Sequence, residues 1–479
     1  MCHSPPSLKA TLLEELVAYA RQFSRHIGYT FHSGSIMLTA YTGCAATEIG
    51  GVTTTSAFHL ASKNNFATNP NLEEYKDLRM VIVDEVSFID HNRDLKKLSS
   101  NLQAFTQCRE YKYGKHPIVF LGDFRQLFPV GGKSILEYPH SLYWTQAVNC
   151  MVELKGTHRF RNCPIMKEIM PALHQKGLSE EHRKLLNSRV IDGKSVKFPK
   201  PDTTRVATFF NRPRSAYNRS VFRDYLRRNH SSCTPDNIPK TALVIKSKLE
   251  WGASKKALSP TFRKVLFEHC TDAQIRNGRG EKCDPFLTLI QGCPIMGTRN
   301  EDVGNGIANG TCAVFRRAVF KPGKSAAPIQ VHGKWVYGID IDDVDHLVLE
   351  WTDSKFEGTF RLCPTTSLFT AQFPLWDENG KVKRVHQSLN VTHFSLVINY
   401  ATTGHKLQGK SLDLLVIAEW SKQENWAYVV LSRVRTLAGL YLKYPIPRDI
   451  DFEPSENYKH MMSTLRLKLA SPTDTSHLT

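Results

Sequence analysis

The sequence predicts an α/β fold built on parallel, doubly wound sheets. Four consecutive apolar residues at 80–83 lead directly into Asp84 and Glu85. Such a run is typical of a strand that is buried on both faces of a parallel sheet. Two further runs, at 35–39 and 116–121, also end in polar loops. Polar residues at the carboxyl ends of parallel strands lie where open α/β sheets bind ligands.

The composition bounds the class of protein. The chain has 479 residues and is 41% hydrophobic, which is enough for two or more domains, and it has no apolar run that could span a membrane. Lysine and arginine outnumber aspartate and glutamate by 63 to 45, a net charge of +18. This balance favours a polyanionic partner, although solvated basic chains are also common. We therefore expect a soluble protein with no membrane contact.

The cysteines indicate a reducing compartment. All eleven are scattered singly, with no C-x-x-C pair and no His/Cys cluster at zinc spacing. We expect free thiols. Nothing at the N-terminus resembles a secretory signal, because residues 11–26 are amphipathic rather than uniformly apolar.

Residues 11 to about 26 are predicted to form a helix with one buried face. In a P-loop protein such a helix follows the motif G-x-x-x-x-G-K-[ST], whose backbone N–H groups surround the phosphates. At the corresponding stretch, Lys9 stands at the lysine position, but Leu8 replaces the glycine and Ala10 has no hydroxyl. No strand lies upstream. We therefore expect the phosphate loop to be missing or degenerate, which puts ATP hydrolysis itself in question.

Residues 35–39 are the next predicted strand, and small and hydroxyl residues follow it. Backbone N–H groups and hydroxyls in such loops can contact a phosphodiester backbone without reading its sequence. The candidates are Thr42, Gly43, Thr55 and Ser56. A plain connection between a strand and a helix uses the same residue types, so both explanations stay open on these residues alone.

The strand at 80–83 ends in two carboxylates, Asp84 and Glu85. Asp84 could hold Mg²⁺ directly or through water, and Glu85 could orient a water molecule toward a γ-phosphate. This is the Walker B chemistry of an NTPase. The alternative is a strand that ends in an acidic turn, and this stretch alone does not decide between the two.

Residues 116–130 form another predicted buried strand with a polar loop after it. Gln126 is the informative residue of that loop, because an amide beside a nucleotide could sense the γ-phosphate and report it to a bound polymer. Three parallel strands with polar carboxyl ends predict a doubly wound, RecA-like domain of roughly 150 residues.

The order of these motifs resembles a known family. The runs T-x-x-T-G-x-A-A-x-x-I-G-G from Thr39, V-I-V-D-E-V-S from Val81 and L-G-D-F-x-Q-L-x-P-V from Leu121 are similar to motifs of the Pif-type 5′-to-3′ DNA helicases, RecD relatives within superfamily one. Thr55 departs from the pattern, since the family often has histidine there. Arg159 matches the position at which the family's arginine reaches the γ-phosphate from the second RecA-like domain.

The middle of the chain supports the same resemblance. Residues 205–218 are similar to the first strand, loop and helix start of the family's second domain, and 286–316 resemble the segment that leads into a small SH3-like insertion. Gly and Asn at 304–310 supply the positive φ that tight turns need. Short alternating strands at 329–339 and 346–351 predict a β-rich insertion of roughly 80 residues.

The last third of the chain carries two more matching motifs. A predicted buried strand at 396–401 is followed by H-K-x-Q-G-x-[ST]-L-D at 405–413. After a further strand at 414–417, residues 426–440 match the helix that carries the family's arginine finger, and Arg433 is the candidate finger.

The resemblance implies an architecture and a set of residue roles. Two RecA-like domains would close on Mg-ATP at their interface, with a first domain at 1–153, a second at 154–300 and 386–450, an SH3-like insertion at 301–385 and a mobile tail at 451–479. Catalytic roles fall on Asp84 (with Mg²⁺), Glu85, Gln126, Arg159 and Arg433. Predicted ATP contacts are Lys9, Gln126, Gly409, Arg159 and Arg433. Predicted nucleic-acid contacts are Thr42, Gly43, Thr55, Ser56, His405, Lys406 and Gln408.

The implied function is ATP-dependent 5′-to-3′ translocation on single-stranded DNA, in DNA repair, recombination or telomere and genome maintenance. We expect a monomer that acts on single strands and duplex junctions, in the nucleus or alternatively the mitochondrion. The alternative is a hydrolysis-deficient, single-strand-binding relic of a helicase or mobile element. Because the motif residues are in place, we favour an intact helicase whose upstream coding sequence supplies the phosphate loop. The loop at 405–409 disfavours an NTPase that acts on something other than nucleic acid.

Overall fold

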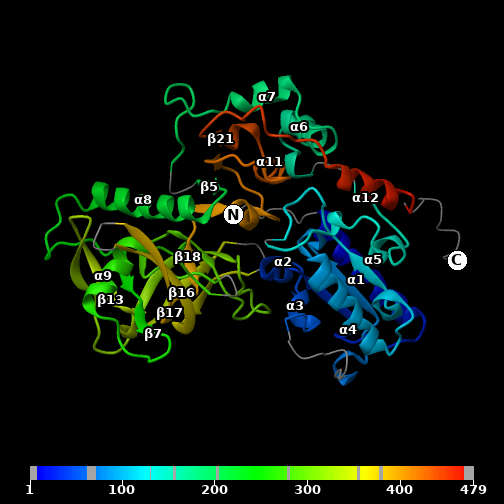
Figure 1. The fold of residues 1–479 in the computed structure, drawn as a ribbon, viewed down its shortest axis with the longest axis horizontal. Helices are drawn as coiled ribbons and strands as arrows, with labels where there is room; N and C mark the ends of the chain where they lie inside the picture. The colour runs from blue at the N-terminus through cyan, green and yellow to red at the C-terminus, as the bar shows by residue number, and fades with distance from the viewer. Residues whose placement is uncertain are drawn as a thin grey trace. The chain divides into compact units, whose positions relative to one another are not determined.

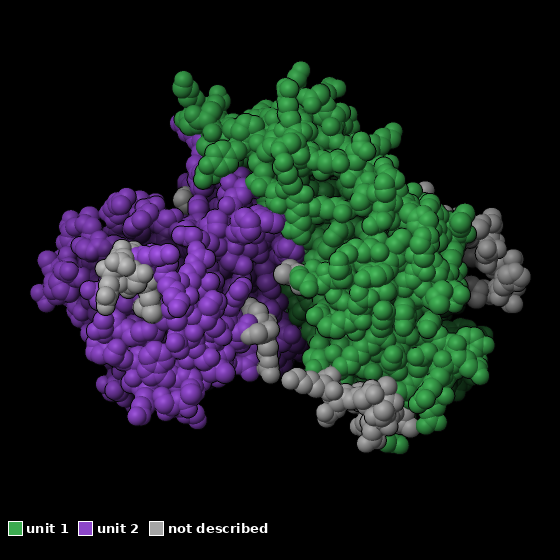
Figure 2. All heavy atoms as spheres, in the orientation of Figure 1, with its two compact units in different colours: residues 1–196, 407–413, 420–479 green, residues 197–406, 414–419 purple. Residues whose placement is uncertain are grey.

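The computed structural model describes residues 8–61, 72–129, 131–154, 158–200, 204–277, 281–352, 356–376 and 381–468. The chain divides into two compact units, coloured green and purple in Figure 2. Unit 1 comprises residues 1–196, 407–413 and 420–479, and unit 2 comprises residues 197–406 and 414–419. The domain boundaries expected from the resemblance follow a different division and stay a prediction.

A parallel sheet forms the centre of unit 1. Its strands are β2 (Val52–Thr53), β1 (Ile36–Ala40), β3 (Met80–Asp84) and β4 (Ile118–Phe120), in that order across the sheet. The register places Ala40 beside both Thr53 and Asp84, so the carboxyl ends of β1, β2 and β3 lie in one row. The predicted strands at 35–39, 80–83 and 116–121 are therefore confirmed, and they are parallel.

Helices cover both faces of this sheet, as Figure 1 shows. On one face α1 (Leu8–His26) packs Leu13 against Ile36 and Ile82, which confirms the predicted amphipathic helix. On the other face α4 (Lys96–Thr106) packs in the core that contains Val81 and Val83. Burial on both faces is the reason that β3 is uniformly apolar.

One strand is less buried than predicted. Ile118, Val119 and Phe120 of β4 are each only partly buried, because β4 lies at the edge of the sheet in the part of the chain that the structure describes. An edge strand is covered less completely than a central one.

The remaining elements of unit 1 come from both ends of the chain. They are α2 (Gly43–Glu48), α3 (Thr54–Ala57), α5 (Leu142–Thr145), α6 (Pro164–Gln175), α7 (Glu180–Asn187), α11 (Trp426–Leu431), β21 (Leu440–Leu442) and α12 (Glu456–Arg466).

Two predictions for this part of the chain are wrong. Residues 456–466 of the supposed mobile tail form α12, whose Tyr458, Met461 and Leu465 are buried in the same core as α4. These apolar residues recur at helical spacing, so burial against the sheet stabilises the helix. The helix expected at 426–440 ends at Leu431, and Arg433 follows its C-terminal cap.

Unit 2 contains a second set of parallel strands. β5 (Arg205–Thr208) lies between β19 (Ala401–Thr403) and β20 (Leu415–Ile417), and α8 (Asn211–Asn229) follows β5, as predicted. The single strand expected at 396–401 is instead two strands in two sheets. β18 (Leu396–Ile398) pairs with β10 (Pro294–Gly297). The chain then changes sheet because the Asn218 side chain binds the backbone of Ile398 and Ala401.

The rest of unit 2 is rich in antiparallel strands. One sheet has the order β15 (Thr359–Leu362), β14 (Val344–Trp351), β11 (Cys312–Phe320), β10 and β18. A second has the order β12 (Ala327–Val331), β13 (Lys334–Asp340), β6 (Ala242–Lys246) and β9 (Phe286–Ile290). A third has the order β7 (Lys248–Trp251), β17 (Val382–His393), β16 (Thr365–Trp376) and β8 (Ile275–Arg276), and α9 (Pro260–His269) contacts β16.

The predicted β-rich character of residues 301–385 is confirmed, and so is the tight turn at 304–310, where Gly306 and Gly310 have φ of 82° and 101°. The strands of this segment do not close on themselves, however. β13 pairs with β6, and β17 pairs with β7, because the segment shares its cores with residues 242–297. An SH3-like topology stays a prediction.

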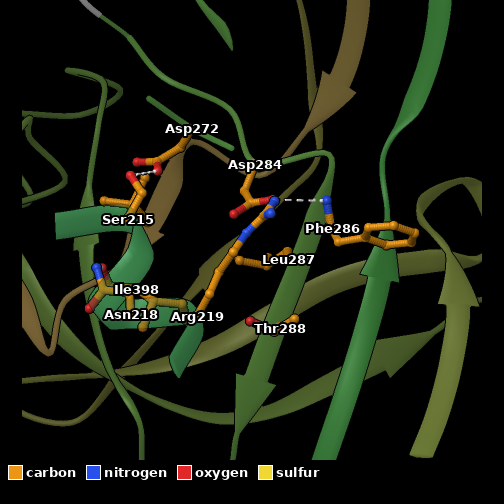
Figure 3. Close-up of a pocket in the computed structure, with 10 residues that line it drawn as sticks. Ser215, Asn218, Arg219, Asp272, Asp284, Phe286, Leu287, Thr288 and Ile398 are labelled. Carbon is orange, nitrogen blue, oxygen red and sulfur yellow. Dashed lines mark hydrogen bonds and ion pairs between the residues drawn. The ribbon is translucent and has the colours of Figure 1, made fainter. Parts of the chain in front are cut away.

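A buried polar network anchors α8 in unit 2. Arg214 of α8 binds Asp272. Figure 3 shows Ser215 beside Asp272, to which it also donates, and Arg219 beside Asp284, to which it donates at 3.1 Å. Burial raises the pKa of Asp284, and Arg219 opposes that change. The small cavity beside these groups has a volume of about 20 Å³, which is the size of one water molecule. We interpret the network as structural.

No helix in the described ranges is long and apolar enough to cross a membrane. The ten cysteines that lie in the described ranges are free thiols, five of them buried.

Candidate active site

The acid pair lies at the carboxyl end of β3, as predicted. Asp84 and Glu85 are 6% and 5% exposed. Glu85 has φ 57° and ψ 46°, the left-handed region that residues other than glycine seldom adopt. The Asp84 carboxylate accepts a hydrogen bond of 2.8 Å from the backbone N–H of Glu85. The Asp84 carboxylate is therefore held in a defined orientation, and Glu85 follows it at the edge where ligands bind.

The loop after β4 carries Asp123, Arg125 and Gln126. Asp123 accepts from the backbone N–H of Arg125 at 2.8 Å and lies 3.5 Å from Nε2 of His174. Burial alone would raise the pKa of Asp123, but His174, the Arg125 N–H and Arg433 together lower it below its ordinary value. Asp123 is therefore an ionised carboxylate near neutral pH.

Gln126 links the loop to two distant segments of unit 1. Its Oε1 accepts from Nε2 of Gln408 at 3.2 Å, and its backbone carbonyl accepts from Nδ2 of Asn425 at 3.2 Å. Gln126 is 6% exposed. The contact joins two motifs that are 282 residues apart. Gly409, the next residue after Gln408, has φ 77°, which glycine adopts without strain.

Arg125 joins this loop to the C-terminal part of the chain by a hydrogen bond and two ring contacts. Its guanidinium is 2% exposed and donates to the carbonyl of Phe452 at 2.8 Å. It also lies over the rings of Tyr428 and Tyr458, at 5.6 and 5.7 Å from their centroids. Its role is therefore to position the loop rather than to contact a ligand.

Both predicted arginines lie in the same unit as the acid pair. Arg159 donates to Oγ of Ser411 at 2.8 Å and to the carbonyl of Ser432 at 2.9 Å. Arg433 is 3% exposed and donates to the carbonyl of Val429 at 2.8 Å and to Oγ of Ser432. These acceptors are neutral oxygens, so neither arginine is neutralised by them.

The electrostatics of the two arginines favour an anionic ligand. Burial, and then the charge of Arg159, lowers the pKa of Arg433. Burial also lowers the pKa of Arg159, while Asp123 and Glu85 oppose the change. Two cations buried close together are costly unless an anion joins them. A phosphate group between them would supply that charge.

The acid pair fits Mg²⁺. No group of three metal-ligating side chains is found in the described ranges. Magnesium is commonly held by one or two carboxylates, with water and phosphate oxygens as the other ligands. Asp84 is a buried carboxylate of the right kind at the right edge, so the residues present are sufficient for this mode.

The predicted nucleic-acid contacts of unit 1 lie at the same edge of the sheet. Thr42 caps α2 by accepting from the N–H of Ala45 at 3.3 Å. Thr55 and Ser56 lie on α3, partly exposed and exposed respectively, and Gly43 is buried at the start of α2. The hydroxyl of Thr42 already serves as a cap, so its predicted contact would use the same oxygen.

Of the other predicted contacts, His405 and Lys406 lie on α10 (Gly404–Leu407), and Gln408 directly follows it. In unit 2, Nζ of Lys406 donates to Oδ1 of Asn309 at 2.6 Å. Asn309 belongs to the glycine and asparagine turn at 304–310, so two motifs that the sequence offered separately meet at one place. His405 is partly exposed beside Lys406.

The structure brings together most of the predicted catalytic residues and adds others. Asp84, Glu85, Gln126, Gln408, Arg159 and Arg433 all belong to unit 1. Sequence reasoning missed Asp123, His174, Ser411, Asn425, Tyr428 and Ser432. Asp123 had a signal, since it lies three residues before Gln126, whereas His174 on α6 had none. Lys9 lies in the first turn of α1, and its side chain and residues 5–7 are outside the described part of the chain.

Comparisons with known proteins agree with this arrangement. Residues 20–170 match the model of the PIF1-like helicase family. No curated protein matches the sequence. A structure of the Pif1 helicase from Candida albicans has 19% identity and a TM-score of 0.62, over 96% of this chain and 93% of that one.

Two structures from Bacteroides show the same fold. Pif1 bound to ssDNA has 18% identity and a TM-score of 0.60, over 96% of this chain and 90% of that one. Pif1 in complex with ADP-AlF3 and ssDNA has 16% identity and a TM-score of 0.59, over 96% of each chain. The predicted fold class is confirmed. Residues 20–170 are therefore similar to the PIF1-like helicase family, and the fold of the chain, with two RecA-like domains, is similar to that of the solved Pif1 helicases.

Proposed function

We propose that this protein is an ATP-dependent DNA helicase that moves 5′-to-3′ along single-stranded DNA. One observation carries the proposal: in unit 1, the carboxylate of Glu85, which directly follows Asp84 at the end of β3, acts on the charges of both Arg159 and Arg433, and Arg433 is buried. Carboxylates for metal and water, with arginines for phosphate charge, are the groups that phosphoryl transfer to water requires. Similarly folded Pif1 structures that contain ADP-AlF3 and ssDNA support it.

The residues of the site have distinct roles in this proposal. Glu85 orients the attacking water, because it lies at the strand end, where its backbone N–H donates to the Asp84 carboxylate. Arg433 and Arg159 stabilise the charge that develops on the transferred phosphoryl group. Asp84 would hold Mg²⁺, which when bound offsets phosphate charge.

Gln126 couples hydrolysis to the nucleic acid in the proposed cycle. Its side chain contacts Gln408, which directly follows α10. A change in the position of Gln126 on loss of the γ-phosphate would therefore reach the loop that carries His405 and Lys406. The nucleic acid would be held by phosphate contacts, so its affinity should fall steeply with salt.

The proposal is tested by ATP hydrolysis with and without oligothymidylate. Glu85→Gln is the control, because it keeps the shape of the side chain and removes its charge. We expect DNA-stimulated turnover in the wild type and at least a hundredfold less in the variant. Turnover that Glu85→Gln leaves unchanged would come from a contaminant and would refute the role of the site.

Direction and biological process are finer parts of the proposal. A duplex with a 5′ single-stranded tail should be unwound and one with a 3′ tail should not. We assign the protein to DNA repair, recombination or telomere and genome maintenance, in the nucleus or mitochondrion, on the strength of the resemblance alone. A monomer is proposed, and sedimentation on a forked duplex tests it.

A second candidate function is single-strand binding without hydrolysis. One observation favours it: Leu8 and Ala10 occupy positions where a phosphate loop has glycine and a hydroxyl residue. The same assay separates the two candidates. Binding of oligothymidylate without stimulated turnover would support the second.

A further inference from the structure

An open groove runs along one side of α8 in unit 2, away from every residue assigned above. It has a volume of about 510 Å³ and is lined by Phe198, Tyr217, Val221, Asp224, Arg227 and Arg228. This volume lies within the range of roughly 300–1,000 Å³ that small-ligand sites occupy. The groove is therefore large enough for a nucleotide-sized group.

An exposed aromatic ring forms one wall of the groove. The Phe198 side chain is 43% exposed, although an apolar ring of this size is usually buried. Tyr217 of α8 lines the same groove and is partly buried. Two aromatic rings on one open groove offer a surface on which a planar base can stack.

The rim of the groove is positively charged. Arg227 and Arg228 are exposed on the last turns of α8, and Lys197 and Lys200 are exposed on either side of Phe198. Asp224 is the one acidic residue of the lining; it lies 3.7 Å from Arg227.

Arg214 and Arg219 of α8 pair with Asp272 and Asp284, but the positive charge of the helix still acts on a neighbouring turn. The pKa of His332, in the turn between β12 and β13, is lowered by burial and then by the charges of Arg223 and Arg219. The field of the helix is thus positive at a second element that packs beside it. An anionic ligand is the complement of such a surface.

We propose that this groove is a second binding site for single-stranded nucleic acid, in which a base stacks on Phe198 and the adjoining phosphates contact Arg227 and Arg228. Aromatic rings interleaved with cations are the general features of sequence-tolerant single-strand binding. An acidic peptide would match the cations but has no use for the exposed ring. The site needs no ATP turnover, so it is independent of the proposed helicase activity.

Site-specific photocrosslinking tests the proposal. A short oligonucleotide that contains 5-iodouracil is irradiated with the full chain, without nucleotide, and the adducts are mapped by mass spectrometry. We expect an adduct on the peptide that contains Phe198. Phe198→Ala should remove that adduct and leave adducts elsewhere, whereas Phe198→Trp should keep it. Absence of any adduct at Phe198 or Tyr217 overturns the proposal.

The salt dependence of binding tests the phosphate contacts. The double variant Arg227→Gln/Arg228→Gln removes two cations from the groove. The slope of log K against log salt for oligothymidylate should become shallower by about 1.4, since each single-strand phosphate contact contributes about 0.7. The matched control is Arg263→Gln/Lys264→Gln on α9, which removes two exposed cations outside the groove. Equal slopes for the two double variants would overturn the proposal.

A competition experiment separates the two classes of partner. A polyglutamate peptide is added at the same total charge as the oligonucleotide. We expect the Phe198 adduct to persist. Complete displacement by the peptide, with no effect of Phe198→Ala on the affinity of oligothymidylate, would show an acidic-protein surface instead. These readouts stand whether or not the chain hydrolyses ATP, so failure here is distinguishable from failure of the helicase proposal.

Discussion

Replacing Arg433 by methionine should make the free protein more stable while it abolishes DNA-stimulated ATP hydrolysis. Arg433 is 3% exposed, and its guanidinium donates to the neutral oxygens of Val429 and Ser432. A buried cation without a paired carboxylate is costly, and a methionine of similar length fills the same space with apolar atoms. The Arg433 guanidinium therefore lowers the free energy of unfolding of the nucleotide-free protein.

The magnitude follows from the burial of this side chain. The pKa of Arg433 falls from its ordinary value to about 9, chiefly through burial. A difference of that size corresponds to about 5 kcal/mol against the charged form. The variant loses the hydrogen bonds to Val429 and Ser432, each of which contributes about 1 kcal/mol net. The free energy of unfolding should therefore rise by about 1–4 kcal/mol near neutral pH.

Urea denaturation, followed by fluorescence, measures this change, with the ATPase rate measured in parallel. The matched control is Arg435→Met, two residues away: Arg435 pairs with Asp413 at 2.5 Å, and its side chain is 33% exposed. It should change stability by less than about 1 kcal/mol. A loss of stability in Arg433→Met, or equal effects on turnover in both variants, would refute the reasoning.

The same lowered pKa predicts a pH dependence. The folded protein releases the Arg433 proton at a lower pH than the unfolded chain does, so wild-type stability gains as pH rises through about 9. The gain in free energy of unfolding that Arg433→Met has over the wild type should therefore be constant below about pH 8 and shrink above it.

Three further outcomes are expected. Asp272→Asn should lower the free energy of unfolding by about 3–5 kcal/mol, because it leaves the Arg214 guanidinium buried without its partner. Urea denaturation measures this loss, and the double variant Arg214→Met/Asp272→Leu should recover most of it. Met461→Ala should lower the free energy of unfolding by about 2–5 kcal/mol, since Met461 of α12 is 1% exposed in the core of unit 1. An unchanged thermal midpoint would mean that this segment is a mobile tail after all. The pKa of Asp123 is lowered in the folded protein, so this carboxylate contributes stability that is present above the unfolded pKa of 3.8 and is lost as pH falls through the folded pKa. The difference in thermal midpoint between wild type and Asp123→Asn should therefore disappear under strongly acidic conditions. A difference that is independent of pH would contradict this.

Local sequence patterns predicted the parallel strands of unit 1 well. The apolar run at 80–83 can be buried only inside a sheet that is covered on both faces, and β3 is such a strand. Polar residues placed directly after it could only lie at the ligand-binding edge. The position of Asp84 and Glu85 at that edge was therefore readable from the order of the residues.

The errors have a common cause. The tail that was expected to be mobile contains only a few apolar residues. They stabilise a helix only because Tyr458, Met461 and Leu465 reach the core of unit 1. The run at 396–401 looks like one strand, but the side chain of Asn218 redirects it between two sheets. In both cases a residue far away in sequence decides the local structure.

The sequence by itself determined which strands are buried, which residues end them, and the order of the motifs, because hydrophobic periodicity and turn residues act over a few neighbours. Only the tertiary structure decided that Gln126 contacts Gln408, that Lys406 contacts Asn309, and that His174 stands beside Asp123. It alone also placed Phe198 on the groove of α8. The physical reason is that these contacts join segments whose separation carries no periodic signal, so packing of the folded chain has to bring them together.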